Sequence, residues 1–308
     1  MIFKEIYRLK RVDNSDFPAI KELFWKVFKK KVSLSYLQNK YNTSYLGVKY
    51  ICSIAYHNKI PVAFYGAIPQ KFKNKDSEIL VAHACDSYTL AAHQRKGLHY
   101  ELAKLAYAIM KENNMKYVYA FHSENTYYST KKLGWKEHKH MQRFHIKIFT
   151  LPVGKLLNKL NSTNLYNPFF KQNVSQDALK KLTSNDKEKF QLHVTQDFIK
   201  YKNSFKSHYC VVLEGCVFWL KIQAIIHVGQ FYAPSEKALQ KAIIKLKQRA
   251  FLLGISELLF QVDSNSIMAK QLQTIVQPKE SWLVGYLDFD PKINLKDFIF
   301  TYSDLDTF

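Results

Sequence analysis

Apolar positions near the start of the chain change from the period of a strand to that of a helix. Residues 3–12 alternate apolar and charged side chains, as a half-buried strand does. From Phe17 to Phe28 the apolar residues follow helical spacing, and Asp16 precedes them as an N-cap candidate. Ser33 stands in the same relation to a short helix from Leu34 to Tyr41. The pattern therefore predicts a strand and two helices.

The next stretch predicts a group of strands around one helix. Strand-like patterns with turn residues between them cover Gly47–His57, Pro61–Pro69 and Glu78–Leu90. Apolar residues at helical spacing follow from Leu98 to Met110. Further strands are predicted at Tyr117–Phe121 and at Met141–Leu151, which we expect to close the sheet of this half.

The rest of the chain repeats this pattern after a connecting segment. Residues 152–190 contain prolines and the asparagine-rich run 158–164, which are typical of a connection. After it, three strands precede a helix at Ser235–Leu253, and strands follow at Leu258–Val262 and Trp282–Phe289. We predict an α+β fold with two domains, 1–151 and 191–308, each a mixed, mostly antiparallel sheet flanked by helices.

Composition fits a compact protein with two cores. The 308 residues are 47% hydrophobic, and no apolar run approaches the roughly 20 residues that span a bilayer. The N-terminus lacks the layout of a signal peptide, so we expect a cytoplasmic protein. The four cysteines form no Cys-x-x-Cys pair, and we therefore expect no metal site and no disulfide framework.

The formal net charge of +21 admits two interpretations. The charge belongs either to a surface that binds nucleic acid or to a solvated lysine-rich surface. The lysines are spread along the chain, and the aromatic residues alternate within strands rather than stacking among arginines, which favours the second. A charge of this sign also attracts anionic partners.

One polar turn carries candidate chemistry. The residues from Ala92 to Gly97 separate a strand from a helix, and Arg95 and Lys96 add positive charge there. The first amides of a helix lack internal partners and bind phosphate well when the preceding backbone allows close approach. Gly97 supplies that freedom because it lacks a Cβ. An ordinary turn has the same composition, so the turn alone does not identify a phosphate site. The residues that follow it are needed to distinguish the two.

Those downstream residues are Asn125 after the second strand, a short helix, and Lys131-Lys132-Leu133-Gly134-Trp135. Together with Gln94 and Gly97 they resemble the GNAT superfamily of N-acetyltransferases, whose pyrophosphate loop has the pattern Gln/Arg-x-x-Gly-x-Gly/Ala. The chain departs from that pattern at His99, where the family has a small residue. The resemblance implies tandem GNAT-like domains.

The resemblance also implies acetyl-CoA as the cofactor. Its pantetheine would meet the backbone of Ser87, Tyr88 and Thr89, and Asn125 would point at the cofactor arm. The loop residues that would hold the pyrophosphate are Gln94, Arg95, Lys96, Gly97, Leu98, His99 and Tyr100. The corresponding turn of the second half, residues 232–236, has no glycine and adds Glu236. We therefore expect a degenerate second half that helps to shape the acceptor cleft.

Acetyl transfer to an amine needs a base for the amine proton and an acid for the leaving thiolate. Many family members have a tyrosine as the acid where this chain has Thr130, so Tyr127 and Tyr128 are the candidates. Candidate bases are His83, Asp86 and His122. We expect His83 and Asp86 to face opposite ways, because they are three apart on one strand.

We therefore predict an acyl-CoA-dependent N-acyltransferase acting on a small amine or amino sugar in a cleft between the two halves. One alternative is a Fem-like transferase that takes its acyl group from aminoacyl-tRNA, in which case the +21 charge would serve tRNA. The other is a catalytically silent module that binds coenzyme A or a protein partner. Outside the tRNA alternative, nucleic acid is not an expected partner.

Overall fold

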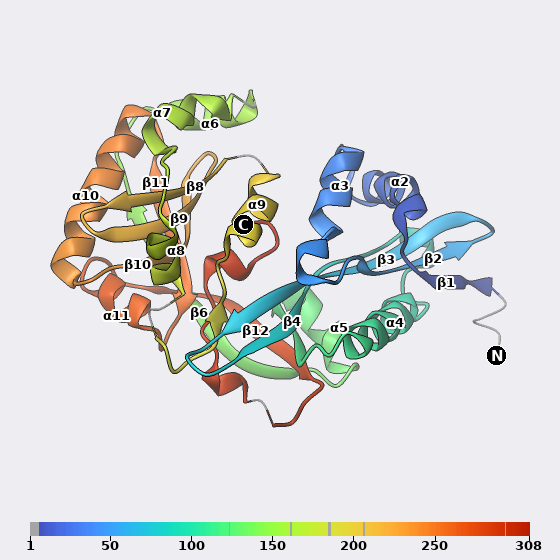
Figure 1. The fold of residues 1–308 in the computed structure, drawn as a ribbon. Coiled ribbons are helices and arrows are strands. Elements are labelled where there is room, and N and C mark those ends of the chain that lie inside the picture. The colour runs from blue at the N-terminus through green and yellow to red at the C-terminus, as the bar shows by residue number, and fades with distance from the viewer. Residues whose placement is uncertain (1–5, 123, 161, 184–185, 206, 293) are drawn as a thin grey trace. The chain divides into compact units, whose positions relative to one another are not determined.

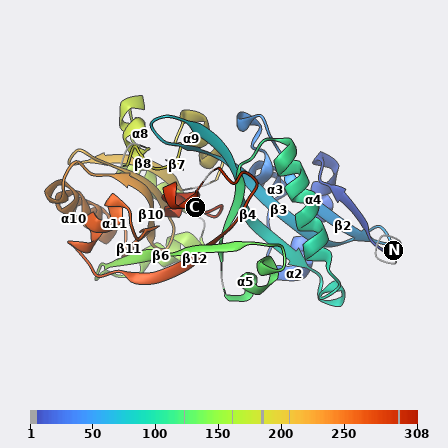
Figure 2. The same cartoon turned by 90° about the horizontal axis from the view of Figure 1, so that it is seen from below.

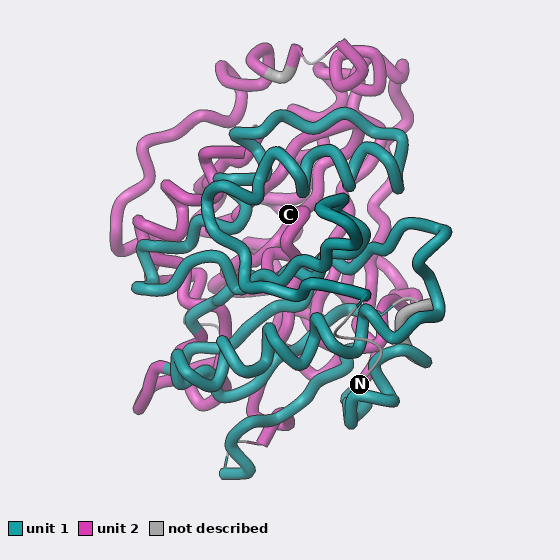
Figure 3. The backbone as a smooth tube through the Cα atoms, turned by 90° about the vertical axis from the view of Figure 1, so that its right-hand side faces the viewer, with its two compact units in different colours: residues 1–71, 79–138, 284–293 teal, residues 72–78, 139–283, 294–308 magenta. Residues whose placement is uncertain are grey.

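The computed structural model describes residues 6–122, 124–160, 162–183, 186–205, 207–292 and 294–308 (Figure 1). The chain forms two compact units whose segments alternate along the sequence (Figure 3). Unit 1 comprises residues 1–71, 79–138 and 284–293, and unit 2 comprises residues 72–78, 139–283 and 294–308. Among the described helices, none is both long enough and apolar enough to cross a membrane.

Unit 1 contains most of the first half of the sequence. Its strands are β1 (Arg8–Arg11), β2 (Ile51–His57), β3 (Ile60–Lys73, to residue 71), β4 (Glu78–Thr89, from residue 79) and β5 (Tyr117–His122). Its helices are α2 (Phe17–Phe28), α3 (Leu34–Tyr41), α4 (Leu98–Glu112) and α5 (Glu124–Lys131). The types and order of these elements follow the hydrophobic pattern of the sequence.

The sheet of unit 1 has the order β1-β2-β3-β4-β5. β1 and β3 pair with β2 in antiparallel fashion, and β4 pairs with β5 in parallel. α4 packs on β1 and β2 (Figure 2), where it buries an apolar cluster that includes Leu102, Ala106 and Met110. α2 and α3 bury a second cluster, around Phe17, Phe64 and other residues, on the opposite face.

Of the two predicted N-caps, the structure confirms one and contradicts the other. Ser33 accepts a hydrogen bond from the amide of Tyr36, so the predicted cap of α3 is confirmed. Asp16 precedes α2 but makes no capping bond to that helix. Its carboxylate instead accepts from the amide of Asp13 and the hydroxyl of Tyr56, which anchors the preceding turn to β2.

Unit 2 is built around strands β8 (His208–Leu213), β9 (Cys216–Ile222), β10 (Ile226–Tyr232) and β11 (Glu257–Asp263). β8, β9 and β10 pair in antiparallel fashion, and β10 pairs with β11 in parallel. The remaining elements are α6 (Val153–Lys159), α7 (Asn167–Phe170), α8 (Gln176–Leu182), β7 (Gln191–Leu192), α9 (Gln196–Asn203), α10 (Glu236–Leu252) and α11 (Ile267–Gln273). Its apolar core includes Phe218, Phe231, Leu246 and Phe260.

The two units exchange their closing strands. β6 (Lys136–Lys147) starts in unit 1, but its residues 141–147 pair with β11 in unit 2. β12 (Lys279–Asp288) starts in unit 2, and its residues 284–288 belong to unit 1, where β12 is the neighbour of β5. The prediction that 141–151 closes the sheet of the first half is therefore wrong, and residues 284–288 take that place beside β5.

The order of elements repeats along the chain. α3, β2, β3, β4, α4, β5, α5 and β6 are matched in turn by α9, β8, β9, β10, α10, β11, α11 and β12. The parallel pair β4–β5 has its counterpart in β10–β11. Because part of the last strand of each series belongs to the other unit, the compact units differ from a division of the sequence at residues 152–190.

Candidate active site

The first feature of the site is a pair of parallel strands that separate. β4 and β5 pair at Ala82 with Val118 and at His83 with Tyr119, and within the described residues the ladder ends there. β4 nevertheless continues to Thr89 and β5 to His122. Beyond the ladder, the edge of β4 that faces β5 carries backbone donors and acceptors for an extended ligand, as an edge strand does.

The second feature is the start of α4, directly after β4. Gly97 is the N-cap residue with φ of 77°, and no side chain caps the helix. The first amides of α4 are therefore available at the positive end of the helix dipole. Arg95 and Lys96 are exposed and form no ion pair with any side chain in the described ranges. Phosphate oxygens are the group that such a helix start binds.

His99, the residue that departs from the family pattern, turns back onto β4. Its Nδ1 lies 2.9 Å from Oγ of Ser87, and its ring packs 5.8 Å from that of Tyr65. Burial lowers the pKa of His99, so the ring is neutral near pH 7. The imidazole is thus held against the sheet by Ser87, one of the predicted cofactor residues.

Just before this loop, the side chains of β4 stop alternating between the two faces of the sheet. Ala84 packs against the α4 cluster and Ser87 bonds to His99 of α4, although the two are three residues apart. Between them, Cys85 and Asp86 both contact the opposite face, through the carbonyl of Gly66 and through α3. One extra residue in a strand has this effect, as in a β-bulge.

Asp86 is held by two residues of α3. Its carboxylate accepts a hydrogen bond from Nζ of Lys40 at 2.6 Å and another from the hydroxyl of Tyr41. Lys40 is buried, and this ion pair places a negative charge beside its ammonium group. The expectation that His83 and Asp86 face opposite ways is wrong, because Ala82 and Ala84 face α4 and His83 between them shares the face of α3.

His83 packs among aromatic rings. It is 2% exposed, stacks on Tyr119 with ring centroids 5.1 Å apart, and meets Phe121 edge-on at 5.6 Å. The hydroxyl of Tyr119 in turn donates to Oε1 of Gln70 on β3. This position, at the last rung of the ladder, gives His83 a clear packing role.

His122 ends β5 on the α4 side of the sheet. Its ring packs 5.3 Å from that of Trp135 and lies against Gly285 of β12, where an added Cβ would be 2.7 Å from Nδ1. The residue is 6% exposed, and neither ring nitrogen has a hydrogen-bond partner in the part of the chain that the structure describes. Burial lowers the pKa of His122, with a smaller opposing effect from Glu137.

The predicted acid residues are less well placed. Tyr128 on α5 is 74% exposed, and Thr130 is buried, with its carbonyl accepting from the amides of Leu133 and Trp135. The side chains of Asn125 and Tyr127 lie outside the described residues. Gly134 has φ of 83° and so forms the turn that leads to Trp135, whose Nε1 donates to the hydroxyl of Tyr107 at 2.8 Å.

Two features of the site were not found in the sequence. Tyr88 was expected to contribute only backbone, but its side chain is buried against Phe24, Phe28 and Phe64, and its hydroxyl has no partner among the described residues. Gly285, which makes room for His122, is far away in the sequence. A glycine inside a strand pattern indicates a close approach, but it does not identify the neighbour.

The matching helix start in unit 2 is closed. Ser235 caps α10 by accepting from the amide of Ala238, and Glu236 places an acid in the first turn. The capping hydroxyl takes up a first-turn amide, and the nearby acid adds a negative charge, so this helix start is unfavourable for phosphate. The two helix starts differ in capping and in charge, and the one at α4 is open to an anion.

Comparison with known proteins gives similarities in part of the sequence and in the fold. Residues 8–137 match the family model of the acetyltransferase (GNAT) domain. A search of curated protein sequences gives no match. The fold is similar to a GCN5-related N-acetyltransferase from Kribbella flavida, with a TM-score of 0.63, 11% identity, and coverage of 91% of this chain and 70% of that one.

Two further structures share the fold over nearly the whole chain. A putative acetyltransferase from Pyrococcus horikoshii has a TM-score of 0.57 and 15% identity, with 96% of this chain and 93% of that one covered. The Saccharomyces cerevisiae N-myristoyltransferase with bound myristoyl-CoA has a TM-score of 0.57 and 10% identity, with 92% and 82% covered. At these identities the likeness concerns the fold alone.

Proposed function

We propose that the protein is an acyl-CoA-dependent N-acyltransferase, because residues 8–137 match the family model of the acetyltransferase (GNAT) domain. Acetyl-CoA is the proposed donor, and a small amine or amino sugar is the proposed acceptor. The proposal places the acyl-CoA in unit 1 only, because the matching helix start in unit 2 is capped by Ser235.

The observation that carries this proposal is the open start of α4 beside the separated strands. Gly97 leaves the first amides uncapped, and Arg95 and Lys96 supply positive charge for a pyrophosphate. The free edge of β4 from Ser87 to Thr89 offers backbone groups to an extended pantetheine. Acyl-CoA contains a pyrophosphate that is followed by an extended pantetheine, so it fits both features.

In the transfer, the amine nitrogen attacks the thioester carbon, a C–N bond forms and the C–S bond breaks. The amine proton passes to a base, and the thiolate takes up a proton. We assign the base to His122, because it is neutral, buried and without a hydrogen-bond partner among the described residues. Asp86 is committed to Lys40 and Tyr41, which favours a structural role.

The acid that protonates the thiolate is proposed from the remaining hydroxyl groups near β4 and β5. Tyr127 and Tyr128 of α5 stay candidates, and the buried hydroxyl of Tyr88 joins them. Phenylalanine at each position removes the proton and keeps the ring. The variant that loses turnover while it still binds acetyl-CoA identifies the acid.

The first experiment is isothermal titration with acetyl-CoA. We expect saturable binding to the parent and none to Gly97→Glu, which strains a left-handed position and adds an acid where phosphate would lie. Gly215→Glu is the matched control, because Gly215 has φ of 75° in the turn between β8 and β9 of unit 2. Binding that survives Gly97→Glu contradicts the proposed site.

The same titration separates the alternatives. A Fem-like transferase would not bind acetyl-CoA, and it would bind aminoacyl-tRNA with an affinity that falls steeply with salt. A silent module would bind acetyl-CoA but release no thiol with any amine. Thr130 at the usual acid position is the observation that keeps the silent module in consideration.

A further inference from the structure

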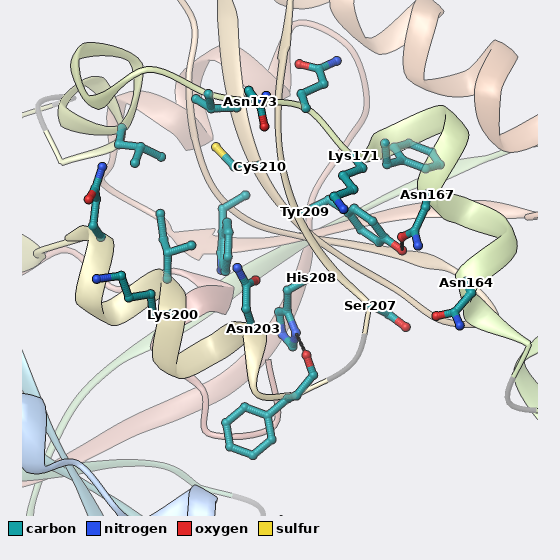
Figure 4. A pocket seen from close by; sticks show the side chains of 18 residues that line it. Asn164, Asn167, Lys171, Asn173, Lys200, Asn203, Ser207, His208, Tyr209 and Cys210 are labelled. Carbon is teal, nitrogen blue, oxygen red and sulfur yellow. Dashed lines mark hydrogen bonds between the residues drawn. The ribbon is translucent and has the colours of Figure 1, made fainter.

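Unit 2 contains a cavity that the proposed transfer reaction does not use. Its volume is about 550 Å³, within the range of about 300 to 1,000 Å³ of small-molecule sites. Its walls come from α9, from the segment after α7, and from β8 and β9 (Figure 4). The cavity lies within one unit, so its shape depends on that unit alone.

The charge of the lining indicates the charge of the ligand. Lys171 and Lys200 come from different walls (Figure 4), and none of the lining residues is acidic. Lys200 also pairs with the exposed Asp197 at 3.2 Å, whereas Lys171 has no ion-pair partner in the described part of the chain. An anionic group is the expected partner of Lys171.

Two buried polar groups show which hydrogen bonds the ligand has to complete. Trp219 is 1% exposed, and its Nε1–H has no acceptor within the described ranges. His208 stacks on it with ring centroids 5.8 Å apart, and its Nδ1 lies 3.3 Å from the carbonyl of Phe205. With Nδ1–H donating to that carbonyl, Nε2 is an acceptor, and none of the described groups donates a hydrogen bond to it.

A hydroxyl group satisfies both requirements, since it donates one hydrogen bond and accepts others. Side-chain amides and a hydroxyl add further polar contacts, from Asn164, Asn173, Gln196, Asn203 and Ser207. Such a lining suits a hydroxyl-rich body better than a hydrocarbon chain.

We infer that this cavity, here called the α9 pocket, binds a phosphorylated sugar or polyol. The phosphate would pair with Lys171, supported by Lys200, and the hydroxyl groups would complete the hydrogen bonds of Trp219 and His208. The inference is independent of the proposed transfer reaction, because every residue involved belongs to unit 2.

The test is isothermal titration at constant ionic strength with glycerol 3-phosphate, ribose 5-phosphate and glucose 6-phosphate. We expect saturable, submillimolar binding of at least one of them, and at least tenfold weaker binding of its unphosphorylated form and of inorganic phosphate. If none of the three binds, or if inorganic phosphate binds as tightly, the inference is overturned.

Variants locate the binding. Lys171→Glu should weaken it at least tenfold, and Asn203→Trp, on the exposed end of α9, should fill the pocket and abolish it. Lys247→Glu is the control, since Lys247 is exposed on α10, away from the pocket. Equal losses in Lys171→Glu and Lys247→Glu would show non-specific attraction and overturn the inference. Should Asn203→Trp fail to fold, His208→Phe replaces it.

A last comparison separates this inference from the proposed function. Gly97→Glu should lose acetyl-CoA binding and keep the binding of the sugar phosphate. Loss of both ligands in that variant, with the fold intact by circular dichroism, would place the sugar phosphate in unit 1 and overturn the assignment to the α9 pocket.

Discussion

A glycine and a histidine from distant parts of the sequence share one space in unit 1. The ring of His122 fills the space that a side chain at position 285 would need, so a Cβ added to Gly285 would overlap the imidazole. Gly285→Ala should therefore destabilise the protein by about 1 to 3 kcal/mol, the usual cost of overpacking. Thermal unfolding measures this change.

The double variant His122→Ala/Gly285→Ala tests the cause. Removing the ring makes room for the new methyl group, so the double variant should be less destabilised than the sum of the two single changes. Additive losses would mean that the two residues do not share this space.

The buried position of His122 also predicts a pH profile. Only the neutral ring accepts the amine proton, and burial lowers its pKa from the usual 6.5. After kcat/KM is divided by the fraction of unprotonated amine, its acid limb should have a midpoint below pH 6.5. The measurement is thiol release from acetyl-CoA with an accepted amine. A limb at or above pH 6.5 would contradict the assignment.

His122→Gln should reduce this rate by a factor of about 10² or more, the usual share of a general base. His140→Gln, an exposed change in unit 2, is the control. A His122→Gln enzyme with the turnover of the parent would exclude this base and return attention to His83.

At the scale of elements, the ion pair between α3 and β4 joins a helix to the strand that leads into the phosphate-binding turn. Asp86→Asn would remove the negative charge that lies 2.6 Å from Nζ of the buried Lys40 and should destabilise the protein. Lys40→Met/Asp86→Asn should recover much of that loss. Denaturant unfolding of the two variants measures both values.

Turnover in the double variant then decides the role of Asp86. Recovered stability together with recovered turnover supports a structural role. Recovered stability without turnover would identify Asp86 as the base in place of His122.

The sequence predicts elements well where their signals are local. The start of α3 is marked by Ser33, which needs only its own helix, and the same holds for Gly97 before α4. The alternation of β4 is lost at Cys85 and Asp86 because residues of β3 and α3 hold them, and no local pattern shows those partners. The faces of His83 and Asp86 were misjudged for this reason.

The same limit applies to strand neighbours. A period of two shows that β6 and β12 are strands, but it does not show which strand each one joins. Both segments have the pattern of a closing strand, and they close the sheets of opposite units. The site is affected as well, because Gly285 reaches His122 only through this exchange.

At the scale of the whole molecule, the exchange makes each half of the sequence depend on the other. The fragment 1–151 would lack residues 284–288 and expose the edge of β5. An exposed edge and its uncovered apolar residues favour aggregation. We expect this fragment to show no cooperative thermal transition, whereas the full chain does.

Co-expression of fragments 1–151 and 152–308 is the matching control. It supplies both exchanged strands and should restore a soluble, cooperatively unfolding complex. A sharp transition for fragment 1–151 alone would show that its sheet is stable without β12.

The exchanged strands also set an order of events during synthesis. β5 leaves the ribosome long before the segment of β12 that covers it, and at about 5 to 20 residues per second the roughly 160 intervening residues take about 10 to 30 seconds. Over that time the edge of β5 in the nascent chain is uncovered. His122, at the end of β5, is not yet packed against Gly285. A chaperone that shields this edge would then raise the yield of active protein, and faster translation of residues 123–283 would shorten the period in which the edge is exposed.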